Sequence, residues 1–276
     1  MSVLDDHLLL YDKPAWVTSH DVVAAVRRTL PRKTKVGHAG TLDPFATGLL
    51  LVLVRRATRA QRFFMALPKR YEVVARFGAV STTGDPEGEI AETGVVPDGP
   101  LVLPVGLVRQ RPPAYSAVKV RGRRAYDLAR AGARPQLAER EVEVYRFEQR
   151  WHEGDLRAFV IECSSGTYVR SLIADLGDAY CLELRRTRIG GFDVADADPG
   201  RPVALAAALN FLPEVRLQAE EARRAAHGIP VQVPAGTVEQ GVSAVRLVDD
   251  AGLIALARPD ADGTVLRVEV GLRAAA

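Results

Sequence analysis

The segment GHAGTLDPFATG, residues 37–48, combines one aspartate and one histidine with three glycines. A carboxylate such as Asp43 can act as a nucleophile or a base, and His38 can bind a substrate or move a proton. A structural role is also open, because Asp-Pro begins many turns and the aspartate then often caps its own backbone. The glycine spacing matches neither the Walker nor the dinucleotide-binding fingerprint. The segment alone therefore indicates an ordered loop with two candidate reactive side chains.

The composition is that of an ordinary globular protein: 276 residues, 47% hydrophobic and 26% charged. This length exceeds the usual size of one domain, so we expect one large domain or two unequal ones. Two cysteines, Cys163 and Cys181, are too few for a disulfide framework and make a poor zinc site. No apolar run is long enough for a membrane span, and the first residues do not resemble a signal peptide. We expect a cytoplasmic protein without a metal.

The net charge of +3 is too small to indicate a nucleic-acid partner, but the charges are unevenly distributed. Basic residues gather in residues 27–35, 55–62 and 109–134, whereas residues 84–98 and the tail after Thr237 are acidic. Separate basic clusters can follow a phosphate backbone. Solvated helix faces and loops give the same pattern, so charge alone leaves both interpretations open.

Alternating residues predict the strands of the first two thirds of the chain. A strand is expected over residues 71–79, and residues 141–151 and 156–163 are expected to form a hairpin across the turn at His152-Glu153-Gly154-Asp155. These strands are joined mainly by connections that suit antiparallel pairing. The prediction is an α+β fold with a mixed, largely antiparallel sheet and flanking helices.

Two helices are predicted from capping residues and apolar spacing. Thr18 or Ser19 can cap a helix that runs to about Leu30. Thr167 can cap an amphipathic helix over residues 168–180. Both helices are expected to flank the sheet.

The composition changes near residue 213. Residues 219–226 are predicted to form a short helix, and three strands are expected over residues 242–248, 253–258 and 265–270, with turns rich in Asp and Gly between them. We therefore divide the chain into a large domain, residues 1–217, and a small β module, residues 218–276.

Four segments, in this order, are similar to the motifs of one known family, the TruB tRNA pseudouridine synthases. Their sequences are DKPAWVTS (residues 12–19), GHAGTLDPFATGLLLV (37–52), RPPAYSAVKVRGRRAYDLAR (111–130), and CSSGTYVRSLIADLG (163–177) followed by LRR (184–186). The resemblance implies a pseudouridine-synthase domain, an RNA-binding insert at about residues 109–134, and a short PUA-like C-terminal domain. It also implies isomerisation of uridine 55 in the T-loop of tRNA, after the base is flipped out of its stack.

The resemblance assigns Asp43, Tyr71 and Arg170 to the catalytic site. Asp43 would be the essential nucleophile or base, a role that suits a carboxylate because positive charge develops at the anomeric carbon of the ribose. Arg170 would pair with both oxygens of Asp43 and keep its pKa low despite burial. Tyr71 would stack on the uracil and help to remove the C5 proton. The reaction exchanges no atoms or electrons with outside reagents, so no cofactor is expected.

Further residues are assigned to RNA binding by the same resemblance. His38 would approach the position that the flipped base leaves, and Leu184 would line the base pocket. The other assigned residues are Tyr168, Lys13, Lys119, Arg123, Arg124 and Tyr126. The expected partner is the T-arm stem-loop of tRNA, bound by a monomer that needs no other protein.

Three other interpretations remain open at this stage. A tRNA-binding chaperone without catalysis would need the basic surface but not the trio of Asp43, Tyr71 and Arg170. A glycosylase would also combine base flipping with a carboxylate, but it would lower the mass of the RNA. A guide-RNA-dependent pseudouridine synthase is closer, although the insert and the short tail favour an enzyme that acts alone.

Overall fold

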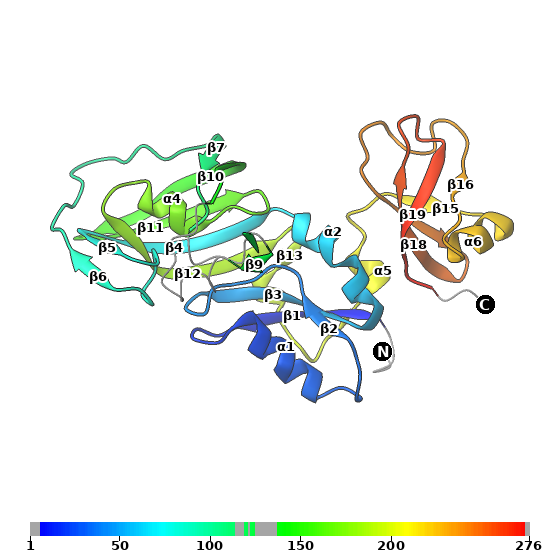
Figure 1. Cartoon of the computed structure of the whole chain (residues 1–276), viewed down its shortest axis with the longest axis horizontal. Coiled ribbons are helices and arrows are strands. Elements are labelled where there is room, and N and C mark those ends of the chain that lie inside the picture. Colours follow the sequence, from blue (N-terminus) through cyan, green and yellow to red (C-terminus); the bar gives the residue numbers. More distant parts are fainter. Residues whose placement is uncertain (1–5, 114–118, 121, 125–136, 274–276) are drawn as a thin grey trace.

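The computed structural model describes residues 6–113, 119–120, 122–124 and 137–273, and Figure 1 shows them as two units of unequal size. The large unit is built on a ten-stranded sheet with the strand order β14-β1-β3-β12-β4-β11-β10-β7, in which β13 also pairs with β12 and β2 with β3. This arrangement confirms the predicted α+β fold, because the sheet is mixed and most of its pairs are antiparallel. The strands are β1 (His7–Lys13), β2 (Val36–His38), β3 (Thr47–Val54), β4 (Lys69–Phe77), β7 (Gly106–Gln110), β10 (Arg140–Glu153), β11 (Leu156–Cys163), β12 (Ala179–Ile189), β13 (Phe192–Asp193) and β14 (Val203–Ala204).

The centre of this sheet is the antiparallel pair β4 and β12. Alternate residues of β4 are buried, as the sequence pattern predicted, and the buried set of Tyr71, Val73, Ala75 and Phe77 packs into the core under the helix α4 (Val169–Ala174). The predicted hairpin is also confirmed, since β10 and β11 pair from the end where Glu153 lies opposite Leu156 to the end where Val144 lies opposite Cys163. One set of alternate side chains along β4 therefore points toward α4 and the segments next to it.

The pair β3 and β12 is parallel, and it brings two distant parts of the chain very close together. Arg185 lies opposite Thr47, and Arg186 lies opposite Gly48. Gly48 has a φ of 104°, and a Cβ atom added there would lie 2.3 Å from the carbonyl oxygen of Arg186. Only glycine combines that backbone conformation with so close an approach. Gly48 thus lets β12 lie against the strand that follows the Asp43 loop.

The first predicted helix is confirmed as α1 (Ser19–Arg28). Its N-cap is Thr18, and a capping box joins Thr18 and Asp21 in both directions. The buried residues Val22, Val23 and Val26 pack against β1 and β3.

The second predicted helix is much shorter than expected. The sequence predicted residues 168–180, but α4 ends at Ala174 and residues 179–189 form the central strand β12. The predicted cap was also wrong: the N-cap position is Tyr168, without a side-chain cap, and the Thr167 hydroxyl donates to the Ser164 carbonyl. Gly177, at φ 139°, lies between the helix and the strand. Pairing of β12 with β4 overrides the local helical pattern, because every polar backbone group of a buried strand needs a partner.

Shorter elements complete the large unit. Two further two-stranded sheets pair β5 with β6 and β8 with β9. These elements are η1 (Arg55–Ala60), α2 (Gln61–Ala66), β5 (Ala79–Ser81), β6 (Ile90–Glu92), β8 (Lys119–Val120), β9 (Arg123–Arg124), η2 (Val194–Asp196) and α5 (Leu205–Ala208).

The small unit is a five-stranded sheet with the order β15-β17-β18-β19-β16, covered by α6 (Ala219–Ala226). The predicted helix and the three predicted strands are all present. The strands are β15 (Glu214–Arg216), β16 (Val231–Gln232), β17 (Val245–Asp249), β18 (Gly252–Pro259) and β19 (Val265–Gly271). Because β15 already belongs to this sheet, the second unit begins a few residues before the division we drew at 217/218.

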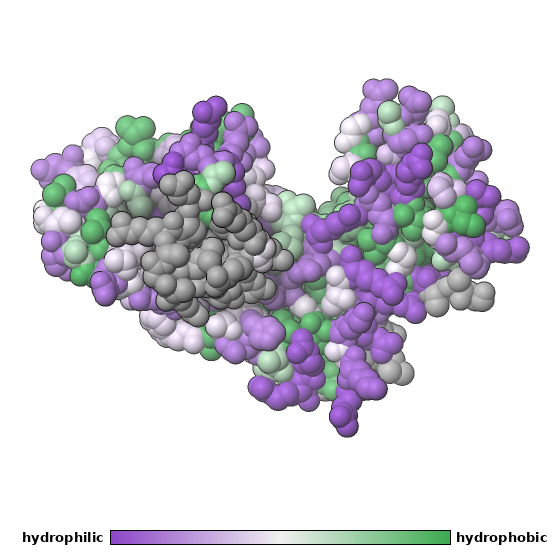
Figure 2. Space-filling model, in the orientation of Figure 1, coloured by the Kyte–Doolittle hydropathy of each residue, from purple (hydrophilic) through white to green (hydrophobic). Residues whose placement is uncertain are grey.

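The two units are in contact through apolar residues and arginines. Leu256, Val270 and Leu272 of the small unit pack into the same cluster as β1, β3 and α5. Arg59 donates to the Gly271 carbonyl over 2.9 Å, and Arg62 forms an ion pair with Glu269. On the face shown in Figure 2, hydrophilic residues predominate on the small unit, and an open notch separates it from the upper part of the large unit. None of the helices formed by the described residues is both long and apolar enough to cross a bilayer.

Candidate active site

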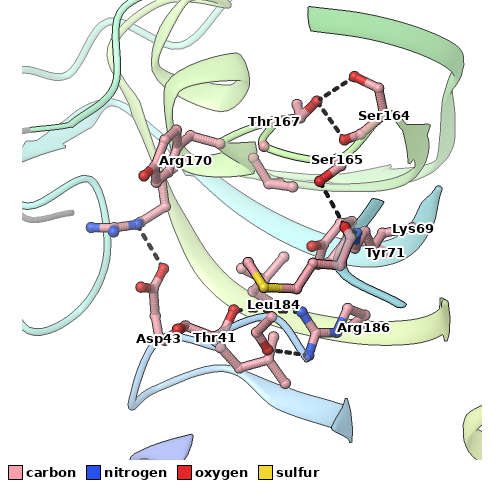
Figure 3. A pocket seen from close by; sticks show the side chains of 16 residues that line it. Thr41, Asp43, Lys69, Tyr71, Ser164, Ser165, Thr167, Arg170, Leu184 and Arg186 are labelled. Carbon is pink, nitrogen blue, oxygen red and sulfur yellow. Dashed lines mark hydrogen bonds and ion pairs between the residues drawn. The ribbon is translucent and has the colours of Figure 1, made fainter. Parts of the chain in front are cut away.

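A cavity of about 250 Å³ opens between the loop after β2, the end of α2, the strands β4 and β12, and the segment that leads into α4. This volume lies just below the range of about 300–1,000 Å³ that holds drug-sized ligands, so it suits a single planar base. Figure 3 shows that its polar side chains come from opposite sides. The lining residues are Gly40, Thr41, Leu42, Asp43, Met65, Lys69, Tyr71, Ser164, Ser165, Gly166, Thr167, Tyr168, Val169, Arg170, Leu184 and Arg186.

Asp43 and Arg170 meet at this cavity although 127 positions separate them in the sequence. Arg170 Nε lies 2.9 Å from Asp43 Oδ2, and the arginine side chain is only 4% exposed. The other arm of the guanidinium turns away, since Nη1 lies 2.8 Å from Asp85 Oδ2 and donates to the Thr83 carbonyl over 2.6 Å. The structure thus divides the guanidinium between two carboxylates, where we had expected it to hold both oxygens of Asp43.

The pKa of Asp43 is raised above its ordinary value, which corrects the prediction that Arg170 would keep it low. Burial is the largest cause, and it outweighs the attraction of Arg170, while the nearby charge of Asp85 raises the pKa further. A guanidinium shared with a second carboxylate compensates the first one less. Asp43 therefore ionises at a higher pH than an exposed aspartate.

Asp85 is the residue of this network that sequence reasoning missed. It is 2% exposed, and its Oδ1 accepts from the Thr83 hydroxyl at 2.5 Å and from the Glu87 backbone N–H at 3.0 Å. A signal was present, because Asp85-Pro86 repeats the Asp-Pro pattern of Asp43-Pro44. We had assigned the surrounding residues only to an acidic stretch.

Tyr71 and Leu184 line the same cavity from neighbouring strands. Tyr71 is 8% exposed and lies directly opposite Arg186. Burial raises the pKa of Tyr71, and the Arg186 cation opposes this effect only in part. Leu184 is 7% exposed and lies opposite Val73. The cavity thus brings together Asp43, Arg170, Tyr71 and Leu184 as expected from the sequence.

Tyr168 also lines the cavity, and Arg140 covers its ring. The Arg140 guanidinium carbon lies 4.5 Å from the centre of that ring, a cation–π distance. Gln110 bonds to the backbone of Tyr168 in both directions, at 2.7 and 2.8 Å. These contacts hold Tyr168 at the rim.

Lys13 does not reach the cavity. It is fully buried, and its ammonium donates to the carbonyl oxygens of Pro14, Val17 and Pro44 over 2.9, 2.7 and 3.1 Å. Burial lowers the pKa of Lys13 to about 8. The structure thus places Lys13 as a support of the loop that follows Asp43, where we had expected it at the RNA.

His38 is not among the residues that line the cavity. His38 pairs with Val52 at the sheet edge, and burial lowers its pKa. Lys119 pairs with Arg124 in the short β8–β9 ladder. Tyr126 lies outside the described residues, as does most of the predicted insert. Within the described part of the chain, no cluster of three or more His, Cys, Asp or Glu side chains could hold a metal ion.

The chain matches the model of the TruB family pseudouridylate synthases (N-terminal domain) over residues 27–169. It is 44% identical to the tRNA pseudouridine synthase B of Thermobifida fusca, across 81% of this chain and 85% of that protein. It is 39% identical to the protein of the same name from Leifsonia xyli, across 93% of each. Among solved structures, a chain of a Cbf5-Nop10-Gar1 complex superposes with a TM-score of 0.70 and 25% identity, across 99% of this chain and 86% of that one.

The fold is therefore that of the pseudouridine synthases. Since both the family model and relatives of nearly full length agree, the chain belongs to the TruB family of pseudouridylate synthases.

Proposed function

We propose that this chain isomerises uridine 55 in the T-loop of tRNA to pseudouridine, with Asp43 as the reacting carboxylate. The observation that carries the proposal is the Asp43–Arg170 pair at a cavity sized for one base. The names of the relatives supply the tRNA substrate, and the T-loop position follows from the resemblance of the four motifs.

The chain's own residues suit the steps of this reaction. A stacked base is flipped out at a cost of a few kcal/mol, which contacts in the pocket offset. Tyr71 and Leu184 would hold the uracil between them, and Tyr168 would contact the nucleotide at the rim. The ionised carboxylate of Asp43 faces the ribose, and Arg170 fixes the direction of that carboxylate. Bond breaking at the anomeric carbon is then assisted by a carboxylate, as in glycosidases.

We propose that no cofactor takes part, because the product has the same atoms and the same oxidation state as the substrate. RNA contacts outside the cavity would come from the basic segment 109–134, with Lys119, Arg123, Arg124 and Tyr126, and from His38. We further propose that the enzyme acts as a cytoplasmic monomer. Native mass spectrometry with a T-arm RNA would show a 1:1 complex, and a dimer would contradict that part.

The decisive experiment is incubation of an unmodified T-arm stem-loop with the enzyme, followed by carbodiimide mapping of pseudouridine. We expect one new stop at position 55, and none with Asp43→Ala. The RNA mass separates the competing functions: isomerisation leaves it unchanged, whereas a glycosylase lowers it by one base. RNA binding with neither change would support the chaperone and refute the proposal.

A further inference from the structure

Two buried cations line the cavity on the side opposite the Asp43–Arg170 pair. Lys69 is 7% exposed and Arg186 is 1% exposed, and both line the cavity. Figure 3 places them together with Tyr71 on one side, while Asp43 and Arg170 lie on the other. We call Lys69 and Arg186 the cationic wall.

Arg186 is held by backbone carbonyls. Its Nε donates to the Leu49 carbonyl at 2.8 Å, its Nη2 to Gly40 at 3.0 Å, and its Nη1 to Thr41 at 3.4 Å. It also lies opposite Tyr71, which lines the cavity from the neighbouring strand. The guanidinium is thus fixed in direction between the Asp43 loop and Tyr71.

Lys69 is held in the same manner. Its ammonium donates to the carbonyl oxygens of Met65 and Leu67, at the end of α2. The Met65 carbonyl also accepts from the Ser165 hydroxyl at 2.7 Å, so the end of α2 is joined to the far rim of the cavity. Lys69 lies two residues before Tyr71 on the same face of β4.

Among the described residues, neither cation has a carboxylate partner. In the described part of the chain, the hydrogen bonds of Lys69 and Arg186 go to backbone carbonyls, and Asp43, the carboxylate that lines the cavity, pairs with Arg170. A buried cation without an opposite charge is costly, because carbonyl dipoles replace its hydration only in part. Such a site gains stability when a negative charge arrives in the cavity.

Isomerisation of uridine produces that charge. The bond between N1 and the anomeric carbon breaks, and its electron pair stays on the base. The base then turns, and C5 forms the new bond to the same carbon. The proton on C5 leaves and N1 takes up a proton, so atoms and electrons balance. If Asp43 adds to C6 first, negative charge also spreads onto the base.

We infer that the cationic wall stabilises the negative charge of the detached uracil, opposite the carboxylate that assists the ribose. The inference rests on the proposed function and adds Lys69 and Arg186 to its catalytic residues. Preorganised charges in a dry site are effective because they need no rearrangement during the reaction. The cavity therefore has an anionic side for the sugar and a cationic side for the base.

Variants of Arg186 distinguish a role of its positive charge from a role of its hydrogen bonds in the structure. Arg186→Met removes the cation with little loss of volume, whereas Arg186→Lys keeps the cation but cannot make three directed bonds. In single-turnover assays on the T-arm RNA, we expect a loss of about 100-fold for Met and about 10-fold for Lys. RNA affinity should change less than about 3-fold, since the charge is needed only after the bond begins to break. Equal losses for Met and Lys would overturn the inference and leave Arg186 a purely structural residue.

Lys69 offers a second test through pH, because burial lowers its pKa to about 8. The titratable groups around it are Arg186 on β12, a cation that lowers the pKa of Lys69 further, and Cys163 on β11, whose own pKa is raised to about 11 so that it is neutral near pH 8. Tyr71 on the same strand has a raised pKa and stays neutral near pH 8. Lys69 is therefore charged below pH 8 and becomes neutral as the pH rises through that value.

We expect the single-turnover rate to fall above about pH 8 and the fall to disappear in Lys69→Arg, which stays charged. A structural role would not give this result, because a neutral amine still has two N–H groups for the two carbonyls. Lys13, whose pKa is also about 8, is the internal control. A fall that persists in Lys69→Arg belongs to Lys13 and overturns the role of Lys69. Every assay includes the wild-type enzyme, which must make pseudouridine. Failure of the proposed function would therefore appear as an inactive wild type, whereas failure of this inference would appear only in the variants.

Discussion

Two groups of arginine–carboxylate pairs in this molecule differ mainly in the exposure of the arginine to water. At the cavity, the Arg170 side chain is 4% exposed, and its partners Asp85 and Asp43 are 3% and 33% exposed. At the contact between the two units, Arg62 and Arg258 share Glu269, and these arginines are 54% and 63% exposed. Water screens the second group, so its net contribution is small. In the proposed function, the pairs with a buried arginine act in the reaction, whereas the pairs with exposed arginines only join two surfaces.

Among the variants that test this comparison, Asp43→Asn should have the largest effect on the rate of pseudouridine formation. The substitution keeps the shape but removes the reacting charge, so we expect single-turnover pseudouridine formation to fall by roughly 1,000-fold or more. RNA affinity, measured by filter binding, should stay within about 3-fold. Activity above one tenth of the wild-type rate would mean that the cavity pair is as dispensable as the pairs at the contact.

Arg170→Lys should have the next largest effect. An ammonium cannot span Asp43 and Asp85 as the planar guanidinium does, and one buried carboxylate then loses its partner. We expect the rate to fall by about 100-fold and the melting temperature to fall as well. The matched control is Arg62→Lys at the exposed contact, for which neither quantity should change appreciably.

Asp85→Asn should move the pH dependence of the reaction. In the proposed reaction Asp43 must lose its proton, and its raised pKa then places the acid limb of the rate above the range of an ordinary aspartate. Removing Asp85 takes away a like charge and leaves Arg170 to Asp43 alone, so the Asp43 pKa falls. The acid limb should move to lower pH by about one unit. A pH–rate profile with an unmoved limb would show that the two carboxylates do not interact.

Glu269→Gln should have the smallest effect. It removes the acid that Arg62 and Arg258 share, and exposed pairs contribute about 1 kcal/mol or less each. Urea unfolding should show a loss of that size, with an unchanged rate of pseudouridine formation. A large loss would show that the contact depends on this pair more than on Leu256, Val270 and Leu272.

The parts of the fold that the sequence predicted well are those with local signals. The β10–β11 hairpin, α1 with its cap at Thr18, and the strands of the small unit all follow from alternation, capping or turn residues. The error at residues 168–180 has a different cause, because the strand β12 is defined by its partners β4 and β3, which lie more than 100 residues earlier. Local periodicity carries no information about such distant pairing.

The candidate site was predictable where motifs exist and not where only the fold brings residues together. Asp43, Arg170 and Leu184 lie in the family motifs, Tyr71 was assigned by the same resemblance, and all four line one cavity. Asp85 was missed because we assigned residues 84–98 only to an acidic stretch and did not use the Asp-Pro signal within it. The raised pKa of Asp43 was missed as well, since it depends on burial and on Asp85.

The close approach of Gly48 to Arg186 restricts which residue can occupy position 48 in the core of this enzyme. The missing side chain of one residue is what allows the two halves of the sheet to close into a single surface at the base of the cavity. Even alanine would push β12, and with it Leu184 and Arg186, away from the Asp43 loop. Position 48 therefore accepts only glycine while β3 and β12 keep this approach.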